Sequence, residues 1–467
     1  MLTEIVKKEL KRIVGEKNAS FSKENLLCYS YDATNSPYMP EAVVFPTDAK
    51  EISLILKMAN SEGFPVIPRG AGTGFSGGSL PVEGGVVLST ERMRNIVEID
   101  TENLVALVEP GVVTWELQTE VEKSGLFYPP DPTSLKFSTI GGNIAECAGG
   151  PRAVKYGVTR DYVLGLEAVL PTGEIINTGV KTAKGVVGYD LTRLLIGSEG
   201  TLGVITKAYL RLLPKPESVV TLLAVFPDLK GAAKAVSGII SAKVIPATLE
   251  LIDSVSIKCV EAHAKLGFPD AGAILLIEAD GNIEAVRKES ETIKRVCLEN
   301  RASSVKAATD KYEVKDLWKA RRAISPSLLK IRPDKINEDV VVPRASIPDL
   351  IEGIQEIAKA KGLLIACFGH AGDGNIHVNV MYDKKDSKEA KAAEDAVVDV
   401  FKLTLKLNGT ISGEHGVGIT KARYLNMELS PASIDVMKRI KNVFDPRGIL
   451  NPGKIFQTDK ETSGYKA

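Results

Sequence analysis

The chain has 467 residues, enough for two or three domains with sizeable cores. Lysine plus arginine equals aspartate plus glutamate at 59 each, so the formal net charge is zero and neither nucleic acid nor an anionic membrane is an expected partner. No run of sequence approaches the roughly 20 apolar residues of a transmembrane helix, so we expect no integral membrane contact. The five cysteines are scattered without a C-x-x-C pair, and the charged N-terminus lacks the apolar centre of a secretion signal. Both features predict a cytoplasmic protein with reduced thiols.

The N-terminal part of the chain predicts a β-α-β unit. Apolar residues recur at helical spacing over residues 2–14, which indicates an amphipathic first helix. Residues 42–46 have the composition of a strand, and Asp48 is a candidate cap for the helix that follows it. This second helix is expected to end near Gly63, and a second strand begins at Val66.

A glycine-rich loop follows the second strand: Pro68-Arg69-Gly70-Ala71-Gly72-Thr73-Gly74-Phe75-Ser76-Gly77-Gly78. Glycines at this density let successive backbone N–H groups turn toward one point, which suits the diphosphate of a nucleotide cofactor. The loop is not a Rossmann fingerprint, because no helical pattern opens out of the glycines, and it lacks the Gly-Lys-Ser/Thr of a P-loop. On spacing alone, a purely structural loop remains the alternative.

Several more glycine- or proline-rich loops follow, each at the end of a strand-like run. They occupy residues 129–133, 139–143, 148–151 and 197–206. Repeated loops without a charged catalytic group indicate one extended ligand lying along them, and a dinucleotide is the natural candidate.

Beyond residue 217 the helix and strand signals alternate as far as about residue 425, a pattern that fits an α+β domain. Helices are expected at 231–241, 283–297, 311–328 and 347–361, and strands at 248–252 and 273–279.

Three of the four histidines lie in two glycine-punctuated segments. His370 and His377 are in the first segment, His415 follows Glu414 in the second, and only His263 lies elsewhere. Two imidazoles and a carboxylate, from His370, His377 and Glu414, are plausible ligands for a divalent transition metal. The alternative is that these histidines are polar residues completing hydrogen bonds near turns.

The first histidine segment predicts a hairpin. Residues 363–368 and 376–380 have the apolar composition of buried strands, and the Gly-Asp-Gly-Asn run at 372–375 tolerates the positive φ that a reversal needs. In the returning strand, His377 and Asn379 point to the same face.

The order of the glycine loops resembles the FAD-binding domain of the vanillyl-alcohol-oxidase / p-cresol-methylhydroxylase superfamily. The histidine segments, Gly-His-Ala-Gly-Asp-Gly-Asn-Ile-His at 369–377 and Gly-Glu-His-Gly at 413–416, with Asn-Pro-Gly-Lys at 451–454, resemble its FAD-linked 2-hydroxy-acid dehydrogenase branch. That branch holds the glycolate oxidase D subunits, the D-lactate dehydrogenases and the D-2-hydroxyglutarate dehydrogenases. The resemblance extends over about residues 38–457.

This resemblance implies an α+β fold, with a two-subdomain FAD-binding domain and a ferredoxin-like cap domain built on an antiparallel sheet. The expected parts are an N-terminal helical segment at 1–37, the FAD-binding domain at 38–216, the cap and substrate domain at 217–425, a segment returning to the FAD domain at 426–457 and a loose tail at 458–467.

The resemblance also implies which residues hold FAD. They are Pro68, Arg69, Gly70, Ala71, Gly72, Thr73, Gly74, Pro130, Asp131, Thr133, Gly141, Gly142, Asn143, Gly149, Gly150, Glu199, Gly200, Gly203, Val204, Ile205 and Asn451. Relatives that bind FAD covalently often carry a histidine in the first glycine loop, where this chain has Thr73. We therefore expect non-covalent FAD.

The implied reaction is oxidation of a small D-2-hydroxy acid, with hydride transfer to flavin N5. A divalent metal (Zn, Fe or Mn) on His370, His377 and Glu414 would lower the pKa of the substrate hydroxyl. His415 is the candidate base, and Asn379 joins the substrate or metal site by resemblance. Arg321 is the candidate clamp for the substrate carboxylate.

Arg321 and Arg322 lie on one expected helix and point about 100° apart, so only one of them can face a site. Spacing from Trp318 resembles the family pattern and favours Arg321 as a bidentate carboxylate ligand. The alternative is that both arginines are solvated.

The substrate preference depends on one departure from the family pattern. Relatives specific for 2-hydroxyglutarate carry a lysine at a fixed distance before a step such as Val342-Pro343, and this chain has Asn337 there, with Lys335 two residues earlier. Asp339 would also repel a dianionic substrate. A monocarboxylate is therefore expected, D-lactate first and glycolate as the alternative.

Reduced FAD must pass its electrons on, and no NAD fingerprint, haem motif or cluster ligand set occurs in the sequence. We expect a soluble carrier such as electron-transferring flavoprotein. The alternatives are quinone or cytochrome reached through partner subunits, and a non-catalytic FAD-bearing subunit of a larger complex.

Overall fold

A computed structural model describes residues 1–265 and 267–456, so the expected loose tail at 458–467 lies outside the described residues. The chain forms two compact units. The N-terminal unit contains Met1–Ala148, Val158–Lys215 and the described residues from Glu414 onward, and the cap unit contains Gly149–Gly157 and Pro216–Gly413. The chain therefore passes between the units four times, after residues 148, 157, 215 and 413. The domain boundaries expected from the sequence stay a prediction.

The N-terminal unit contains three sheets. In the first, with order β1-β2-β4-β3, strands β2 and β3 both pair with β4 in parallel. The second sheet has the order β5-β6-β10-β8-β9 and is antiparallel throughout, and the third is the antiparallel pair β11-β7. The strands are β1 Ala19–Ser20, β2 Ala42–Val44, β3 Val66–Arg69, β4 Val86–Ser89, β5 Ile96–Asp100, β6 Val105–Val108, β7 Leu126–Phe127, β8 Val163–Val169, β9 Ile175–Gly179, β10 Val204–Arg211 and β11 Leu213–Pro214.

In the N-terminal unit, helix α3 (Ala49–Glu62) begins and ends as its sequence signals predict, whereas residues 139–143, expected as a loop, contain the start of helix α5 (Ile140–Glu146), which the Thr139 hydroxyl caps. In α3, the Asp48 side chain accepts from the amides of Lys50 and Glu51 at 2.8 and 2.9 Å, and Gly63 ends the helix at φ +76°. The buried faces of α1 and α3 pack into one apolar cluster with strands of the first sheet. The helices are α1 Glu4–Val14, α2 Lys23–Cys28, α3 Ala49–Glu62, α4 Thr114–Glu122, α5 Ile140–Glu146, α7 Leu191–Leu195, α14 Leu425–Glu428 and α15 Pro431–Phe444, with short 3-10 turns at Glu16–Asn18, Thr159–Asp161 and Ala422–Tyr424.

The C-terminal segment completes the first sheet. Leu450 forms a parallel bridge with Val66, and the amide of Asn451 donates to the Val66 carbonyl at 2.8 Å. The partly buried ammonium of Lys441 on α15 donates to the carbonyls of Thr201 and Leu450, both at 2.8 Å. The last described residues therefore lie beside the strand that leads into the first glycine loop.

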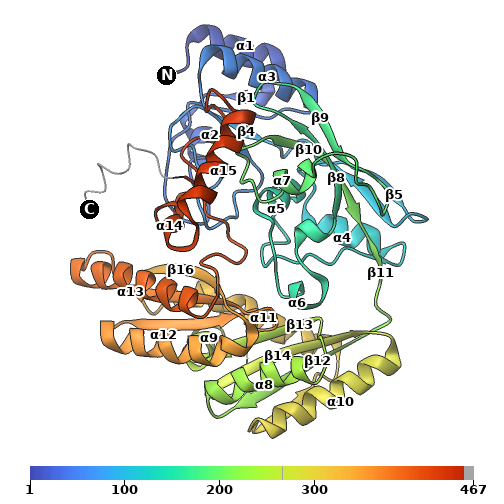
Figure 1. Cartoon of the computed structure of the whole chain (residues 1–467), viewed down its shortest axis with the longest axis vertical. Helices are drawn as coiled ribbons and strands as arrows, with labels where there is room; N and C mark the ends of the chain where they lie inside the picture. The colour runs from blue at the N-terminus through green and yellow to red at the C-terminus, as the bar shows by residue number, and fades with distance from the viewer. Residues whose placement is uncertain (266, 457–467) are drawn as a thin grey trace. The chain divides into compact units, whose positions relative to one another are not determined.

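The cap unit is built on a seven-stranded antiparallel sheet with the order β15-β12-β14-β13-β17-β18-β16. Figure 1 shows α8, α10 and α12 on the near side of this sheet. On the other face α9 and α11 pack against one another and bury Ile252, Phe368 and Met381. The elements are β12 Ser218–Phe226, β13 Thr248–Asp253, β14 Ala273–Gly281, β15 Ser304–Ala307, β16 Asp334–Val341, β17 Leu364–Gly369, β18 Asn375–Tyr382, α6 Ala153–Tyr156, α8 Leu229–Ser241, α9 Ser254–Ala264, α10 Ile283–Glu299, α11 Lys311–Leu328, α12 Ile347–Lys361 and α13 Ser387–Lys406, with a 3-10 turn at Arg344–Ser346.

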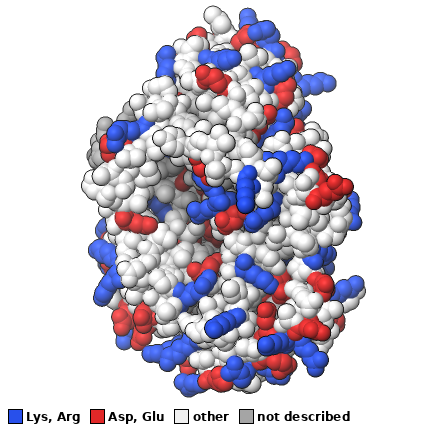
Figure 2. Space-filling model, turned by 45° about the vertical axis from the view of Figure 1, so that its right-hand side comes forward, with Lys and Arg blue, Asp and Glu red and all other residues white. Residues whose placement is uncertain are grey.

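The observed architecture confirms the predicted α+β fold class, with an antiparallel sheet in the cap unit. Among the described residues, no helix is both long and apolar enough to span a lipid bilayer. Figure 2 shows both acidic and basic side chains over the upper and the lower part of the visible face, in keeping with the zero formal charge.

Candidate functional site

The predicted histidine hairpin is present as β17 and β18. The two strands pair in antiparallel register, with Phe368 opposite His377 and Ala366 opposite Asn379. The reversal passes through Gly374 at φ +93°, where a side chain would collide with the backbone carbonyl of Val342. Glycine is therefore required for the tight return that places His370 at the lip of the hairpin.

A polar surface occupies the α9/α11 face of the cap sheet, at its β13-β17-β18-β16 side. His377 lies opposite Asp339 of β16, and Asn379 lies opposite Asn337. Directly opposed residues in an antiparallel pair share a face with their Cβ atoms about 5 Å apart. His377, Asn379 and Asp339 are all buried, and the Asn379 Oδ1 atom has no hydrogen-bond partner among the described residues.

Glu250 of β13 connects this surface to α11. Its carboxylate is fully buried and accepts from Nδ1 of His370 at 2.5 Å and from Nε of Arg321 at 2.6 Å. Burial alone would raise the pKa of Glu250, but the charges of Arg321 and His370 outweigh it and hold the pKa at about 2. Glu250 is therefore ionised, and both of its partners are held as hydrogen-bond donors.

The bond to Glu250 determines which ring nitrogen of His370 is available. With Nδ1 donating to the carboxylate, Nε2 is the ring nitrogen that a metal could bind once it carries no proton. A carboxylate behind a metal-binding histidine fixes the tautomer and ring orientation and increases the basicity of the ligand nitrogen. His370 is thus prepared to bind a metal through Nε2.

The three predicted metal ligands lie together. One ligand atom each from His370, His377 and Glu414 lies within 4.8 Å of the other two. Glu414 directly follows Gly413, the last residue of the cap unit, whose amide donates to the Oδ2 atom of Asp339 at 2.9 Å. Two imidazoles and one carboxylate fit a divalent transition metal that keeps an open position for substrate.

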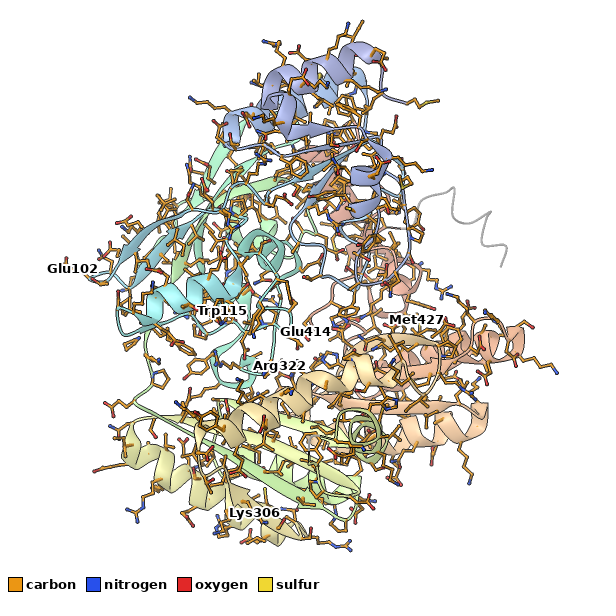
Figure 3. All side chains as sticks on the ribbon, turned by 180° about the vertical axis from the view of Figure 1, so that it is seen from behind. Glu102, Trp115, Lys306, Arg322, Glu414 and Met427 are labelled. Atoms are coloured by element: carbon orange, nitrogen blue, oxygen red, sulfur yellow. The ribbon has the colours of Figure 1, made fainter. Side chains whose placement is uncertain are left out.

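The two candidate arginines on α11 have different surroundings. Arg321 is buried, its Nη2 lies 2.5 Å from Glu250, and its guanidinium lies 4.8 Å from the centre of the Phe368 ring. Arg322, labelled in Figure 3, is exposed. The structure therefore places Arg321, and not Arg322, beside the histidines, and it adds Glu250 as a partner that the sequence did not predict.

In the N-terminal unit, the first glycine loop lies against α5. A side chain at Gly70 would collide with the Thr139 hydroxyl, and its added Cβ would lie 3.6 Å from the Cα of Gly142. A side chain at Gly72, which has φ +68°, would overlap the Arg69 guanidinium. Glycine at these positions avoids both collisions and leaves the loop backbone uncovered, as a cradle for a diphosphate requires.

Asn451 connects three of the predicted cofactor segments. Its Nδ2 donates to the carbonyls of Gly78 at 2.8 Å and Glu199 at 2.7 Å, while its own φ is +47°. A side chain at Gly200 would approach both Pro68 and Asn451 within 3.4–3.7 Å. The first glycine loop, the 199–200 turn and the C-terminal segment therefore meet at one place.

The N-terminal unit fits FAD by a second observation. The Oγ of Ser76 and the Oδ1 of Asn451 are buried and have no hydrogen-bond partner among the described residues. Buried polar atoms are rarely left unpaired in proteins, so these two atoms indicate a polar ligand beside the glycine cradle.

Several other predicted cofactor residues contact other parts of the protein or belong to the cap unit. Asn143 donates from Nδ2 to the Thr114 hydroxyl at 2.7 Å, and the carbonyl of Pro130 accepts from Gln118 at 2.8 Å. Gly203 precedes β10, which contains Val204 and Ile205, and Gly149 and Gly150 belong to the cap unit. Gly141 packs on Pro110. Cofactor roles for these residues stay a prediction.

His415 lies in the N-terminal unit beside the first glycine loop. Its ring packs on Phe75, with centroids 5.1 Å apart and a tilt of 34°. Because Phe75 belongs to the loop predicted to hold FAD, this contact links the candidate base to the cofactor segment.

Sequence reasoning missed Glu250, although a signal was present. The strand Thr248–Asp253 is otherwise largely apolar, and alternation places Glu250 on the same face as Ile252. A carboxylate in the middle of a buried strand requires polar or charged partners, but the sequence does not indicate which ones.

Two family profiles match the chain. The family described as "FAD binding domain" matches residues 40–179, and the family described as "FAD linked oxidases, C-terminal domain" matches residues 215–455.

Several named proteins are similar to this chain over nearly its whole length. "Glycolate oxidase subunit GlcD" of Bacillus subtilis is 49% identical over 98% of each chain. "D-lactate dehydrogenase" of Anaerostipes hadrus is 37% identical over 95% of this chain and 94% of that protein. Among solved structures, p-cresol methylhydroxylase with substrate bound has a TM-score of 0.81 over 98% of both chains at 19% identity, which shows a common fold.

Replacement of either histidine should separate metal binding from FAD binding. We expect His370→Ala and His377→Ala to weaken metal binding at least about tenfold, because each removes one ligand, and to leave the protein yellow. Metal analysis and the flavin spectrum of purified protein measure the two effects. His263→Ala, which removes the remaining cap histidine, is the matched control; loss of FAD in the hairpin variants would show that these histidines are structural.

Glu250→Gln should weaken metal binding about 10–100-fold, because the neutral amide no longer fixes the tautomer of His370. Metal titration of the chelator-treated variant measures this change, with unfolding temperatures checking for loss of the buried charge pair. Glu299→Gln, an exposed glutamate on α10, is the control. Unchanged metal affinity in Glu250→Gln would contradict an orienting role.

Proposed function

Because the chain belongs to the FAD-linked oxidase family, in the glycolate oxidase D subunit and D-lactate dehydrogenase branch of the vanillyl-alcohol-oxidase / p-cresol-methylhydroxylase superfamily, we propose that it oxidises a small 2-hydroxy monocarboxylate to the 2-oxo acid. One observation supports this proposal above all. His370 and His377 converge with Glu414, and Glu250 holds His370 in the tautomer that binds a metal.

Glycolate is the first candidate substrate. The relative that is 49% identical is named for glycolate oxidase, whereas the relatives named D-lactate dehydrogenase are 37% and 38% identical. The comparisons therefore favour glycolate over the D-lactate that the sequence analysis placed first. D-lactate is the second candidate, because several relatives over nearly the full chain carry that name.

The reaction removes two hydrogens from the substrate: a proton from the hydroxyl group and a hydride from the α-carbon. FAD, when bound, supplies the hydride acceptor, and a metal ion held by His370, His377 and Glu414 supplies a Lewis acid for the hydroxyl oxygen. In this proposal His415 receives the hydroxyl proton at a ring nitrogen, since imidazole exchanges protons near neutral pH.

Arg321 is proposed to bind the substrate carboxylate. Its contacts with Glu250 use Nε and Nη2, so Nη1 is the donor directed to the substrate. Glu250 also prevents rotation of the Arg321 guanidinium. A guanidinium that is already held in place loses little conformational entropy when the substrate binds. Asn379 contributes a buried Oδ1, which accepts a hydrogen bond from the substrate hydroxyl or a metal-bound water.

The surroundings of Asn337 support a substrate with a single carboxylate. Asn337 is neutral and lies opposite Asn379, and Asp339 is buried one pair further along the strand. The Lys335 ammonium is already bound to the hydroxyl of Ser325 at 2.6 Å, and burial lowers its pKa to about 8. A second carboxylate on the substrate would thus have no dedicated cation to bind it and would be repelled by Asp339.

Electrons from reduced FAD are proposed to pass to a separate protein. Electron-transferring flavoprotein is one candidate acceptor, as the sequence analysis expected. The name of the B. subtilis relative, a glycolate oxidase subunit, supports the alternative that partner subunits take the electrons. FAD is proposed to be bound without a covalent bond, given Thr73 in the first glycine loop.

A non-catalytic FAD-bearing subunit is the rival function. Such a subunit has no need for a buried carboxylate that orients a histidine, and a charged pair of this kind is costly to bury. The Glu250–His370 contact therefore counts against the rival.

Anaerobic absorbance of the purified protein tests the substrate. We expect glycolate to bleach the flavin band near about 450 nm, D-lactate to bleach it less efficiently, and L-lactate and D-2-hydroxyglutarate to leave it unchanged at equal concentration. Bleaching by D-lactate alone would make D-lactate the substrate. No bleaching by any acid in metal-loaded protein would overturn the proposal in favour of the non-catalytic subunit.

Arg321→Lys tests whether Arg321 binds the substrate carboxylate, because lysine keeps the positive charge beside Glu250 but lacks the planar guanidinium. We expect the KM for glycolate to rise about 10-fold or more, as for loss of a charged hydrogen bond. Arg322→Lys on the same helix is the matched control and should change the KM less than about twofold. A larger effect at Arg322 would show that the wrong arginine has been identified.

A further inference from the structure

Glu146, the last residue of α5, lies where two segments of the N-terminal unit come together. A side chain added at Gly78 would place its Cβ 2.6 Å from the Oε1 atom of Glu146, and at Gly74 the distance would be 4.0 Å. On the other side, a side chain at Gly416 would come within 2.6 Å of the Oε2 atom. The carboxyl group thus fills the space between the first glycine loop and the segment that carries His415.

The neighbouring carboxylate of Glu199 is fully engaged. It is buried and accepts from the amides of Val417 at 2.7 Å and Gly418 at 2.6 Å, one on each oxygen. Glu199 adopts φ +51°, an uncommon conformation for a residue with a side chain. Burial raises the pKa of Glu199, and the amides of Val417 and Gly418 and the charges of Lys454 and Lys421 oppose that rise. Because Glu199 has these contacts, it is the carboxylate of the pair that is favoured to carry the negative charge.

Glu146 has none of these stabilising contacts. Its Oε2 atom is buried and has no hydrogen-bond partner among the described residues. Burial, the charge of Glu199 and the charge of Asp32 raise the pKa of Glu146 well above its usual range. The raised pKa favours the neutral carboxylic acid, which has one O–H hydrogen to donate.

We propose that the Glu146 carboxyl donates a hydrogen bond to bound FAD and is a cofactor-binding residue beyond those the family resemblance implies. The inference rests on FAD binding at the first glycine loop, and it does not depend on which hydroxy acid is the substrate.

The chemistry of the ligand explains why a neutral acid is placed here. A flavin dinucleotide presents phosphate, ribityl and ring-carbonyl oxygens, all of which accept hydrogen bonds. An ionised carboxylate beside these oxygens would repel them, whereas a neutral carboxyl donates to them. The ionised Glu199 turns its oxygens toward the backbone amides of the 417–418 segment and leaves the donor role to Glu146.

Three variants of Glu146 separate donation from packing and charge. Glu146→Gln keeps a neutral donor of similar size, Glu146→Met keeps the volume without a donor, and Glu146→Ala removes both. Exposed Glu102, labelled in Figure 3, provides the control pair Glu102→Gln and Glu102→Met. FAD is added back to stripped protein without substrate, and the Kd is measured from quenching of flavin fluorescence.

We expect the Kd for FAD to rise about tenfold in Glu146→Met and Glu146→Ala, as for loss of one hydrogen bond to a buried partner, and to change less than about threefold in Glu146→Gln and both Glu102 variants. Equal Kd values in wild type and Glu146→Met would overturn the inference. An equal loss in the Gln and Met variants would also overturn it, because the donor would then be irrelevant. Unfolding temperatures of the stripped proteins show whether a variant still folds, and Glu146→Gln remains informative if Glu146→Ala does not. Failure of the wild type to bind FAD would instead contradict the proposed function.

Discussion

The buried carboxylate of Glu250 is the interaction on which the cap site depends. It lies within a sheet that excludes water, so its charge is tolerated only because Arg321 and His370 both donate to it. Removing Arg321 would leave a buried carboxylate without the guanidinium beside it. The same two bonds fix the orientation of one metal ligand and of one substrate-binding cation. Glu250 therefore positions two parts of the proposed site.

A second buried carboxylate has a comparable role in the N-terminal unit. Glu199 holds the amides at 417–418, two residues beyond His415, while its backbone carbonyl accepts from Asn451. His370 and His415 lie in loops, which have little stability of their own. Buried acids supply the missing constraints, through charge-assisted hydrogen bonds that are short and directional.

Local signals in the sequence were sufficient for most of the fold. Alternation and glycine placement predicted the β17–β18 hairpin, and helix caps predicted the start and end of α3, because both patterns depend on neighbours in the chain. The spacing on α11 predicted that only one arginine faces the histidines. Glu250 and its 120-residue separation from His370 were beyond such reasoning, since a pairing between distant strands is decided by the packing of the whole sheet. The same holds for Glu146, whose significance depends on an unpaired oxygen that only the structure shows.

The central claim is that this chain uses a metal held by the cap histidines to oxidise a 2-hydroxy acid with its FAD. The most direct test is the rate of anaerobic flavin reduction by glycolate before chelation, after chelation, and after a divalent metal is added back. The account predicts that chelation lowers the rate at least about 100-fold without releasing FAD, and that added metal restores it. Unchanged flavin reduction in protein shown to be metal-free would contradict the account.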